Sequence, residues 1–450
     1  MVERIIAPEV SRLISEKRFD EIKKLIGSFH PEDIATLISE IEDAHGKILV
    51  FRLIPSDKII DAFENLEPDP QKDILQALSD EKAREILNEM APDERTELFE
   101  EMPAELVTNF LNLLSPQARK ISTELLGYPE DSVGRLITPE FVQLYEDMSV
   151  GQAFEHIRSV GLDTEIVYHC YVLDKEKRLI GLVSLKKLVL ADPARKIREI
   201  MNTDVIKVNV YIDREEAAQI FKKYDLLALP AVDNTNKLLG IVTFDDFVDV
   251  LEDEATEDFE KIAAVLPVDK PYMEANFFEI VWKRSFWLLV LLALESLSGF
   301  VLQNYSSTIS RVVALTFFLP ILIGTGGNSG TQSATVIIRS LATGQIQPSE
   351  FFRVVIREAS LGVFIGVILA VFGLIRAFLQ QGDWWLSMSV GISMGITIVL
   401  STTVGASLPL VVRKFRFDPA LMSGPLITTI VDVVGIAIYF EIAQILLKLS

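Results

Sequence analysis

Residues 428–435 read TTIVDVVG, and Asp432 in this stretch is the only charged residue between Leu421 and Phe440. An apolar segment of this length is long enough to cross a bilayer as a helix. An ionisable side chain inside such a span is costly, so it is expected to face a partner, a cavity or an ion pathway. The stretch therefore predicts a membrane helix with a functional carboxylate. The alternative is that Asp432 makes a buried hydrogen bond between helices.

Further apolar segments precede this one and predict a membrane domain of five spans. The candidate spans are 285–303, 312–338, 359–379, 384–412 and 419–447. If the front half of the chain is inside, eight basic residues lie on the inner side: Lys283, Arg284, Arg339, Arg353, Arg357, Arg413, Lys414 and Arg416. Only Arg311, Arg376 and Lys448 lie on the outer side. This asymmetry predicts a multi-pass protein of the cell (inner) membrane, with a cytoplasmic N-terminus and an external C-terminus.

The second span contains the glycine-rich stretch GTGGNSGTQS at residues 324–333. Each glycine costs about 1 kcal/mol in a helix, so an unwound segment is expected at a depth comparable to that of Asp432. Non-helical backbone at membrane depth is tolerated where it lines a cavity. The sequence therefore predicts a cation pathway lined by Gly326, Gly327 and Asn328. Close packing between helices is the alternative role for the glycines.

Two other features of the spans bear on this pathway. Pro320, Pro409 and Pro425 lie inside the longer spans and are candidates for helix kinks. Glu295, in ALESLSG at residues 293–299, is a second acid within a span. We expect Glu295 to be a polar packing contact or a charge in a vestibule.

Charge divides the chain into two unlike parts. The whole chain has 64 acidic and 43 basic residues, of which nine acids and eleven bases follow residue 270, so the first 270 residues carry a net charge of −23. Such acidity disfavours nucleic acid as a partner and favours cations, although it also simply keeps a domain soluble. The single cysteine, Cys170, excludes an intrachain disulfide, and the N-terminus shows no apolar signal segment.

The acidic front half contains two kinds of repeat. Residues 1–128 hold short helical stretches punctuated by Pro and Asp, such as HPEDIATLISEI and APDERTELFEEM, which predict a small solenoid. In residues 129–254, KRLIGLVSLKKLV recurs as NKLLGIVTFDDFV at an offset of 59. Each of these units is predicted to run strand, helix, strand, strand, helix, which resembles a tandem pair of CBS domains with units at 129–199 and 200–254.

The CBS resemblance implies a possible nucleotide site. A Ser or Thr followed three residues later by Asp holds an adenosine ribose in many CBS domains, and Thr243 and Asp246 match this pattern in the second unit. The first unit has Ser184 but Lys187 in place of the acid. An adenine nucleotide such as ATP is therefore expected, if anywhere, at the second unit. The alternative is a repeat without a ligand.

An acidic connecting helix is predicted over residues 244–270. Apolar residues recur at helical spacing from Phe244 to Ile262, and residues 245–260 contain nine acids and no base. Like charges at these spacings destabilise a helix. Divalent cations would remove this penalty, whereas a solvated acidic face is the ordinary alternative.

The order of these parts resembles the MgtE family of magnesium channels, and the resemblance covers essentially the whole chain. Its most specific motifs are LPILIGTGGNSGTQSATVIIRSLATG and PLITTIVDVVG. It implies a multidomain membrane protein with an α-helical N-terminal solenoid (1–128), an α/β tandem CBS pair, an acidic connecting helix (244–270) and a five-span α-helical transmembrane domain (271–450). It also implies a homodimeric channel that carries Mg²⁺ in the lipid bilayer.

The resemblance implies roles for individual acids. Asp432 would contribute to the ion site of the pore, and regulatory Mg²⁺ would bind at Asp61, Asp93, Asp225, Asp246, Asp249, Glu254, Glu257 and Asp258. Mg²⁺ bound there would close the channel and give negative feedback on uptake. Gly424 replaces the Asn that usually precedes the Pro of the last motif, which removes a possible side-chain ligand.

Other functional classes remain as alternatives. An ion-coupled or proton-coupled carrier for Mg²⁺ or Co²⁺ would use Asp432 as a protonation site. A membrane enzyme is disfavoured, because all four histidines precede the spans and no HExxH motif occurs. An anion channel is disfavoured because the charges inside the spans are acids. The sequence leaves open the order of preference among Mg²⁺, Co²⁺, Ni²⁺ and Mn²⁺.

Overall fold

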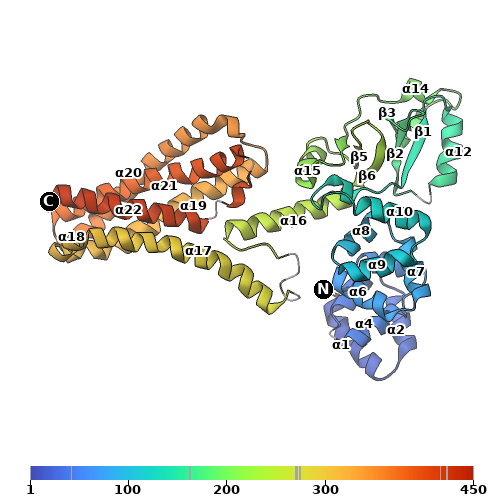
Figure 1. The fold of residues 1–450 in the computed structure, drawn as a ribbon, viewed down its shortest axis with the longest axis horizontal. Coiled ribbons are helices and arrows are strands. Elements are labelled where there is room, and N and C mark those ends of the chain that lie inside the picture. Colours follow the sequence, from blue (N-terminus) through green and yellow to red (C-terminus); the bar gives the residue numbers. More distant parts are fainter. Residues whose placement is uncertain are drawn as a thin grey trace. The chain divides into compact units, whose positions relative to one another are not determined.

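A computed structural model describes residues 2–41, 43–161, 164–268, 272, 275–415, 417–421 and 424–448. The chain forms two compact units, residues 1–251 and residues 252–450, and each is considered by itself. Figure 1 shows short helices and two small sheets in the first unit and long helices in the second. Arg416, one of the bases assigned to the inner side, lies outside the described residues.

The first unit begins with a stack of short helices (Figure 1). They are α1 (Val2–Ser15), α2 (Phe19–Ile26), α3 (Pro31–Ser39), α4 (Ala44–Phe51), α5 (Ile59–Glu64), α6 (Pro68–Ala77), α7 (Asp80–Glu89), α8 (Pro92–Glu100), α9 (Ala104–Leu113) and α10 (Pro116–Leu125). Proline occupies the first turn of α3, α6, α8 and α10, where its missing N–H costs nothing. One apolar core, which includes Ile22, Phe63 and Leu87, runs through the stack and confirms the predicted solenoid.

Two similar α/β modules follow, as the internal repeat predicts. β1 (Phe141–Tyr145), β2 (Ile166–Leu173) and β3 (Leu179–Ser184) form one sheet, and β4 (Val208–Asn209), β5 (Ala228–Val232) and β6 (Leu238–Thr243) form the other. The first pair of strands in each sheet is parallel and the second is antiparallel. The helices of these modules are α11 (Val133–Leu136), α12 (Val150–Val160), α13 (Leu185–Leu190), α14 (Ile197–Ile200), α15 (Arg214–Lys223) and α16 (Phe244–Ile262). Buried Tyr171, Leu179 and Ile241 join the two sheets in one core.

The second unit contains five helical segments that are long and apolar enough to cross a membrane, counted over the described residues. Its elements are α17 (Phe277–Asn304), α18 (Ser306–Arg311), η1 (Val313–Phe318), α19 (Leu319–Ala342), η2 (Pro348–Glu350), α20 (Phe351–Gln381), α21 (Trp384–Lys414), η3 (Pro419–Leu421) and α22 (Gly424–Leu447). The five predicted spans are thus confirmed. α21 packs against α19, α20 and α22, whereas α17 packs along α22 and remains mostly exposed.

The predicted break in the second span is wrong. α19 is one continuous helix from Leu319 to Ala342, and the glycine-rich stretch lies within it. Gly326, Gly327 and Gly330 of this stretch lie where neighbouring helices approach so closely that a side chain would not fit without a shift. Pro320 and Pro425 are not mid-helix kinks either, since they occupy the first turns of α19 and α22. Of these three prolines, Pro409 is the one that lies beyond the first turn, inside α21.

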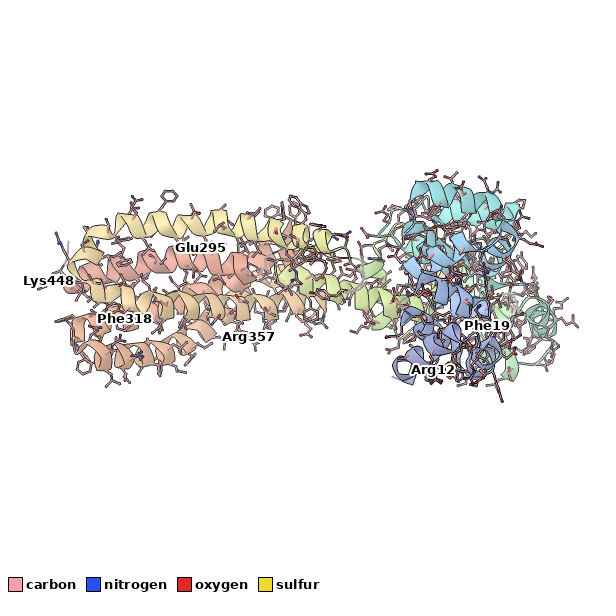
Figure 2. The ribbon with its side chains drawn as sticks, turned by 90° about the horizontal axis from the view of Figure 1, so that it is seen from below. Arg12, Phe19, Glu295, Phe318, Arg357 and Lys448 are labelled. Atoms are coloured by element: carbon pink, nitrogen blue, oxygen red, sulfur yellow. The ribbon has the colours of Figure 1, made fainter. Side chains whose placement is uncertain are left out.

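Figure 2 shows the long helices as a bundle, with Phe318 and Lys448 at one end and Arg357 toward the opposite end. Arg357 is one of the bases assigned to the inner side and Lys448 one of those assigned to the outer side. The bundle therefore separates these two bases in the way that the predicted topology requires, while the direction in which it crosses the membrane stays a prediction.

Candidate cation sites

Asp432 lies within α22 and is 5% exposed. Its Oδ1 atom has no hydrogen-bond partner among the described residues. A buried carboxylate oxygen without a partner is costly, so a native protein keeps one only where another species satisfies it. This observation favours an ion or water at Asp432 over the alternative of an interhelical hydrogen bond from Oδ1.

The glycines of α19 determine how closely the helices around Asp432 approach each other. A Cβ on Gly326 would lie 3.0 Å from Thr397 Cγ2 of α21 and 3.0 Å from Val431 Cγ1 of α22. A Cβ on Gly327 would lie 2.6 Å from Thr428 Cγ2. Gly326 and Gly327 are therefore buried in helix contacts, whereas Asn328 is exposed. Their role in lining a pore stays a prediction, and for the two glycines only backbone atoms could provide it.

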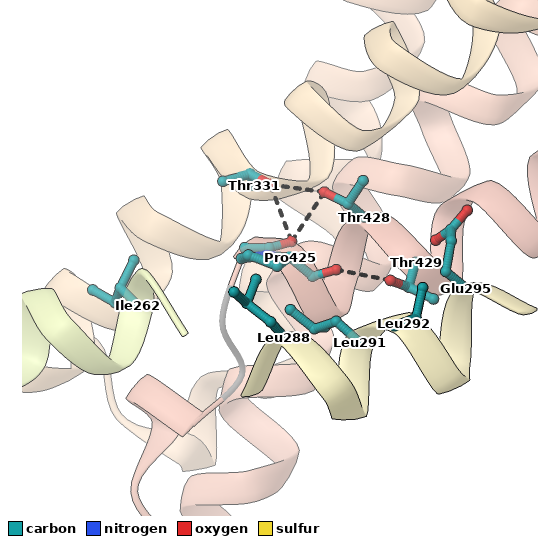
Figure 3. A pocket seen from close by; sticks show the side chains of 10 residues that line it. Ile262, Leu288, Leu291, Leu292, Glu295, Thr331, Pro425, Thr428 and Thr429 are labelled. Carbon is teal, nitrogen blue, oxygen red and sulfur yellow. Dashed lines mark hydrogen bonds between the residues drawn. The ribbon is translucent and has the colours of Figure 1, made fainter. Parts of the chain in front are cut away.

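A cavity of about 620 Å³ lies between α17, α19 and α22 (Figure 3). Leu288, Leu291, Leu292 and Glu295 line it from α17, Thr331 from α19, and Gly424, Pro425, Thr428 and Thr429 from α22, with Ile262 at the end of α16. Gly424 thus lines this space without a side chain. The carbonyl of Gly424 accepts hydrogen bonds from Thr428 Oγ1 at 3.0 Å and from Thr331 Oγ1 at 3.4 Å.

A second group of carboxylates gathers in the first unit. Asp93 in α8 is close enough to Asp246 in α16, to Glu94 and to Glu165 for their charges to act on it. The Oδ1 atom of Asp93 is buried and has no hydrogen-bond partner among the described residues. We name Asp93, Glu94, Glu165 and Asp246 the acidic cluster.

The acidic cluster has an excess of negative charge, although the buried Arg95 lies close enough for its charge to act on Asp93. Burial, followed by repulsion from its acidic neighbours, raises the pKa of Asp93 well above its ordinary value and that of Glu94 to about 8. The same two causes raise the pKa of Glu165 to about 6. Burial also raises the pKa of Asp246, although hydrogen bonds from Thr243 act in the opposite direction. Protons or cations therefore stabilise this arrangement.

The other predicted regulatory acids are distributed over both units. The charge of Asp61 on α5 acts on Glu64, and that of Glu64 acts on Glu94. The charge of Asp249 acts on Glu94 and Asp246. Asp61 and Asp249 therefore lie near the acidic cluster. Asp225 is exposed after α15 with φ 49°, and the described interactions place it in neither group of acids. Glu254, Glu257 and Asp258 lie on the part of α16 that belongs to the second unit.

Within the second unit, α16 is joined to the membrane helices by an ion-pair network. Lys261 Nζ lies 2.6 Å from Glu257 Oε1 and 2.7 Å from Asp418 Oδ2, beside η3. Burial, followed by the charge of Asp418, raises the pKa of Asp258. Across the described residues, no three His, Cys, Asp or Glu side chains are arranged to hold a metal ion directly.

Sequence reasoning did not identify Lys261, Asp418, Glu94 or Glu165. Lys261 follows directly after the run of nine acids, and a base next to such a run could have been expected to pair with it. Glu165 and Asp418 lie in loops, and only the tertiary fold brings them to the other acids.

The predicted nucleotide residues are already engaged with each other. Asp246 Oδ2 accepts hydrogen bonds from Thr243 N at 2.8 Å and from Thr243 Oγ1 at 2.7 Å. A separate cavity of about 570 Å³ lies on the first CBS module, lined by Tyr168, His169, Ser184, Leu185, Lys186, Val189, Leu190 and Leu227. In that module Ser184 caps α13 and Lys187 Nζ donates to the carbonyl of Ile200 at 3.0 Å.

Comparison with known families defines the class of this protein. Residues 29–131 match the "MgtE intracellular N domain", residues 133–193 and 197–253 match the "CBS domain", and residues 319–442 match a family described as "Divalent cation transporter". Together with the five apolar helices, these matches define a multi-pass membrane protein of the divalent-cation transporter class, with a CBS pair and an N-terminal helical domain.

Similar proteins identify the family. The magnesium transporter MgtE of Thermus thermophilus is 38% identical over 450 residues, which cover 99% of this chain and 100% of that protein. The magnesium transporter MgtE of Bacillus subtilis is 33% identical over 96% of this chain and 95% of its own length. This chain therefore belongs to the MgtE family of magnesium transporters, as its motifs predict.

Solved structures resemble the first part of the chain. The cytosolic domain of the Mg²⁺ channel MgtE in complex with ATP is 33% identical with a TM-score of 0.51, and the match covers 54% of this chain and 99% of that one. The soluble part of a magnesium transporter matches with the same TM-score at 29% identity.

Proposed function

We propose that this protein is a Mg²⁺-selective channel that mediates magnesium uptake and is gated by cytoplasmic Mg²⁺ bound to acids of its soluble domains. The observation that carries the proposal is Asp432, a buried carboxylate whose Oδ1 has no described partner inside a bundle of membrane helices. The relatives are named magnesium transporters, which supports Mg²⁺ as the permeant ion and a transporter rather than an enzyme.

The permeation step follows from the chemistry of Mg²⁺. This ion gives up its water reluctantly and prefers oxygen ligands. A pathway beside Asp432 selects it as a hydrated ion, whose bound waters donate to carboxylate, carbonyl and hydroxyl oxygens. In a homodimer with its pore on the two-fold axis, two copies of Asp432 lower the energy of a divalent cation inside the bilayer.

Gating follows from the acidic cluster. Cations between Asp93 and Asp246, with Asp61 and Asp249 nearby, replace repulsion by attraction and stabilise the compact soluble unit. Sites at Asp225, Glu254, Glu257 and Asp258 extend the same effect along the chain. Mg²⁺ that binds only the closed arrangement stabilises it, so a rise in cytoplasmic Mg²⁺ closes the channel.

ATP is a proposed second ligand of the CBS pair. The ATP complex of the similar cytosolic domain supports this proposal. Thr243 and Asp246, which match the nucleotide pattern of CBS domains, are one candidate position. Because these two side chains bond to each other, the cavity that includes Ser184 is an alternative position. Calorimetric titration with ATP decides between them: a loss of affinity in Asp246→Ala supports the second module, and a loss in Ser184→Ala supports the first.

A coupled carrier is the second candidate, because a buried acid such as Asp432 also serves as a protonation site. The test is Mg²⁺ uptake into proteoliposomes with and without a proton gradient. The channel proposal predicts uptake that follows the Mg²⁺ gradient and the membrane potential alone. Uptake that requires an opposing proton gradient would favour the carrier.

A further inference from the structure

Glu295 shares one face of α17 with the residues that line the membrane cavity. Leu288, Leu291, Leu292 and Glu295 recur at helical spacing, so they form a single stripe. All four line the cavity against α22 (Figure 3). Figure 2 shows Glu295 well inside the length of the bundle. An acid at that place is expensive in lipid, so it is expected to face an ion, water or a polar group.

Glu295 also acts on Asp432. Among the described residues, Glu295 is close enough for its charge to act on the Asp432 carboxylate, which lies on the neighbouring helix α22. Two carboxylates on facing helices repel each other unless a cation compensates them. This repulsion is a cost that packing alone does not explain.

Unpartnered polar atoms lie on both of the facing helices. Asp432 Oδ1 on α22 and Ser298 Oγ on α17 have no hydrogen-bond partner within the described part of the chain, and each residue is 5% exposed. Ser298 follows Glu295 by three residues, so both lie on the same side of α17. Buried polar atoms of this kind indicate a species that satisfies them.

The hydroxyl groups of the cavity suit a hydrated cation. Thr428 Oγ1 donates to Gly424 O at 3.0 Å and Thr429 Oγ1 donates to Pro425 O at 3.1 Å, so their protons point to the backbone (Figure 3). Each hydroxyl keeps accepting capacity, although Thr428 Oγ1 also faces Thr331 Oγ1 at 3.5 Å. The waters around a divalent cation point their hydrogens outward and need acceptors of this kind.

The cavity is also large enough for such an ion. Six waters at about 30 Å³ each occupy about 180 Å³. The cavity has a volume of about 620 Å³, so a hexahydrated cation fits without losing water.

We propose that Glu295, which lines the cavity, and Asp432, one helical turn beyond Thr428 on α22, together form a binding position for a hydrated divalent cation between α17 and α22. The inference rests on the proposed function and extends it, because it adds a membrane acid outside α19 and α22 to the ion pathway. Glu295 holds the ion through its waters, raises its local concentration and favours divalent over monovalent cations.

The first test measures Mg²⁺ flux into proteoliposomes that contain the full chain, as a function of Mg²⁺ concentration. Glu295→Gln keeps the size of the side chain and removes its charge, so we expect the half-saturating Mg²⁺ concentration to rise about tenfold. Glu295→Asp restores the charge and should recover most of the affinity. The matched control is Glu279→Gln, because Glu279 lies on the same helix but pairs with Lys283 at 3.1 Å.

Equal half-saturation in Glu295→Gln and Glu279→Gln would overturn the inference while leaving the channel proposal intact. A fall in maximal flux with unchanged half-saturation and unchanged preference for divalent ions would show a role in packing, and would overturn it as well.

The second test measures binding without relying on flux. In a Cys170→Ala background, Glu295→Cys places a thiolate in the cavity, and thiolates favour Cd²⁺. We expect Cd²⁺–thiolate absorption that Mg²⁺ suppresses and that Asp432→Asn weakens, but none for Ser296→Cys on another face of α17. Cd²⁺ binding at position 295 in a protein that does not transport Mg²⁺ would contradict the channel proposal and support the cation position. Equal Cd²⁺ signals from the two cysteine variants would reject the cation position itself.

Discussion

Asp432 and the acidic cluster present the same chemical group in opposite surroundings. In the second unit, one carboxylate is buried among apolar helices, and glycines bring the helices together around it. In the first unit, Asp93, Glu94, Glu165 and Asp246 crowd together and repel one another. Under the proposed function, these are two ways of making a protein depend on a cation. A single buried carboxylate, with Glu295 as its acidic neighbour, attracts an ion that passes, whereas a crowded group needs ions in order to stay compact.

The largest expected effect follows from removing the isolated carboxylate. Asp432→Ala should reduce Mg²⁺ flux by about a hundredfold, which corresponds to about 3 kcal/mol of lost stabilisation of the ion in the bilayer. The thermal midpoint of the purified protein should not fall, because an unpartnered buried carboxylate contributes little to stability. Flux is measured in proteoliposomes.

Asp432→Asn separates charge from shape at the same position. Full flux through this variant would show that the charge of Asp432 is not what attracts the ion. Asp432 could then no longer be compared with the acidic cluster as a charged cation site.

The acids of α16 should affect gating and leave the selectivity for Mg²⁺ unchanged. The variant replaces Asp246, Asp249, Glu254, Glu257 and Asp258 by their amides. The cytoplasmic Mg²⁺ concentration needed for half-closure should rise about tenfold, because each weak site contributes to one two-state equilibrium. Channel recordings across a range of cytoplasmic Mg²⁺ measure this shift.

A matched control keeps the same change in net charge. It neutralises five exposed acids of the helical stack, namely Asp73, Asp80, Glu81, Glu89 and Glu105. If both variants close at the same Mg²⁺ concentration as the unmodified protein, the acids of α16 form only a solvated face.

Protons should substitute for cations in the acidic cluster. Raised pKa values, about 8 for Glu94 and about 6 for Glu165, mean that the folded state binds more protons than the unfolded state between about pH 4.5 and 8. Stability should therefore fall as the pH rises through this window. Without divalent ions, the thermal midpoint of residues 1–262 should drop by roughly 5 °C between pH 5.5 and 8.5.

Added Mg²⁺ should flatten this pH dependence, because the ion compensates the same charges. Glu94→Gln should also flatten the pH dependence of the thermal midpoint, even when a chelator removes divalent ions. A midpoint that rises with pH in chelator would have the opposite sign and would contradict the account of the acidic cluster.

The smallest effect concerns the packing around Asp432. A Cβ on Gly327 would lie 2.6 Å from Thr428 Cγ2, so Gly327→Ala should destabilise the membrane unit by about 1–3 kcal/mol. Gly324 has nothing within 4 Å of such a Cβ, so Gly324→Ala should be neutral or slightly stabilising. Thermal unfolding in detergent compares the two variants, and equal midpoints would show that the glycines do not fix the helix contacts.

The sequence was sufficient for most of the architecture and for part of the site. Apolar length predicted the five spans, and the offset of 59 predicted the two CBS modules, because both signals are local and repeat along the chain. The break expected in α19 was wrong, since glycine weakens an isolated helix but permits the close approach of α21 and α22. Helix propensity alone cannot distinguish these outcomes.

Contacts between segments that are distant in the sequence could not be predicted from it either. Asp432 stood out because it is alone in a long apolar stretch. Glu165 and Asp418 lie in ordinary loops, and their place near Asp93 and Lys261 depends on folding. Glu295 was recognised as a membrane acid, but its relation to Asp432 and to the cavity appears only in three dimensions.

Single-channel recording of the full protein, with cytoplasmic Mg²⁺ varied, tests the central claim most directly. The account predicts unitary currents carried by Mg²⁺, with an open probability that falls as cytoplasmic Mg²⁺ rises and a unitary current that disappears in Asp432→Ala. Mg²⁺ uptake without unitary currents, or an open probability that does not change with cytoplasmic Mg²⁺, would contradict it.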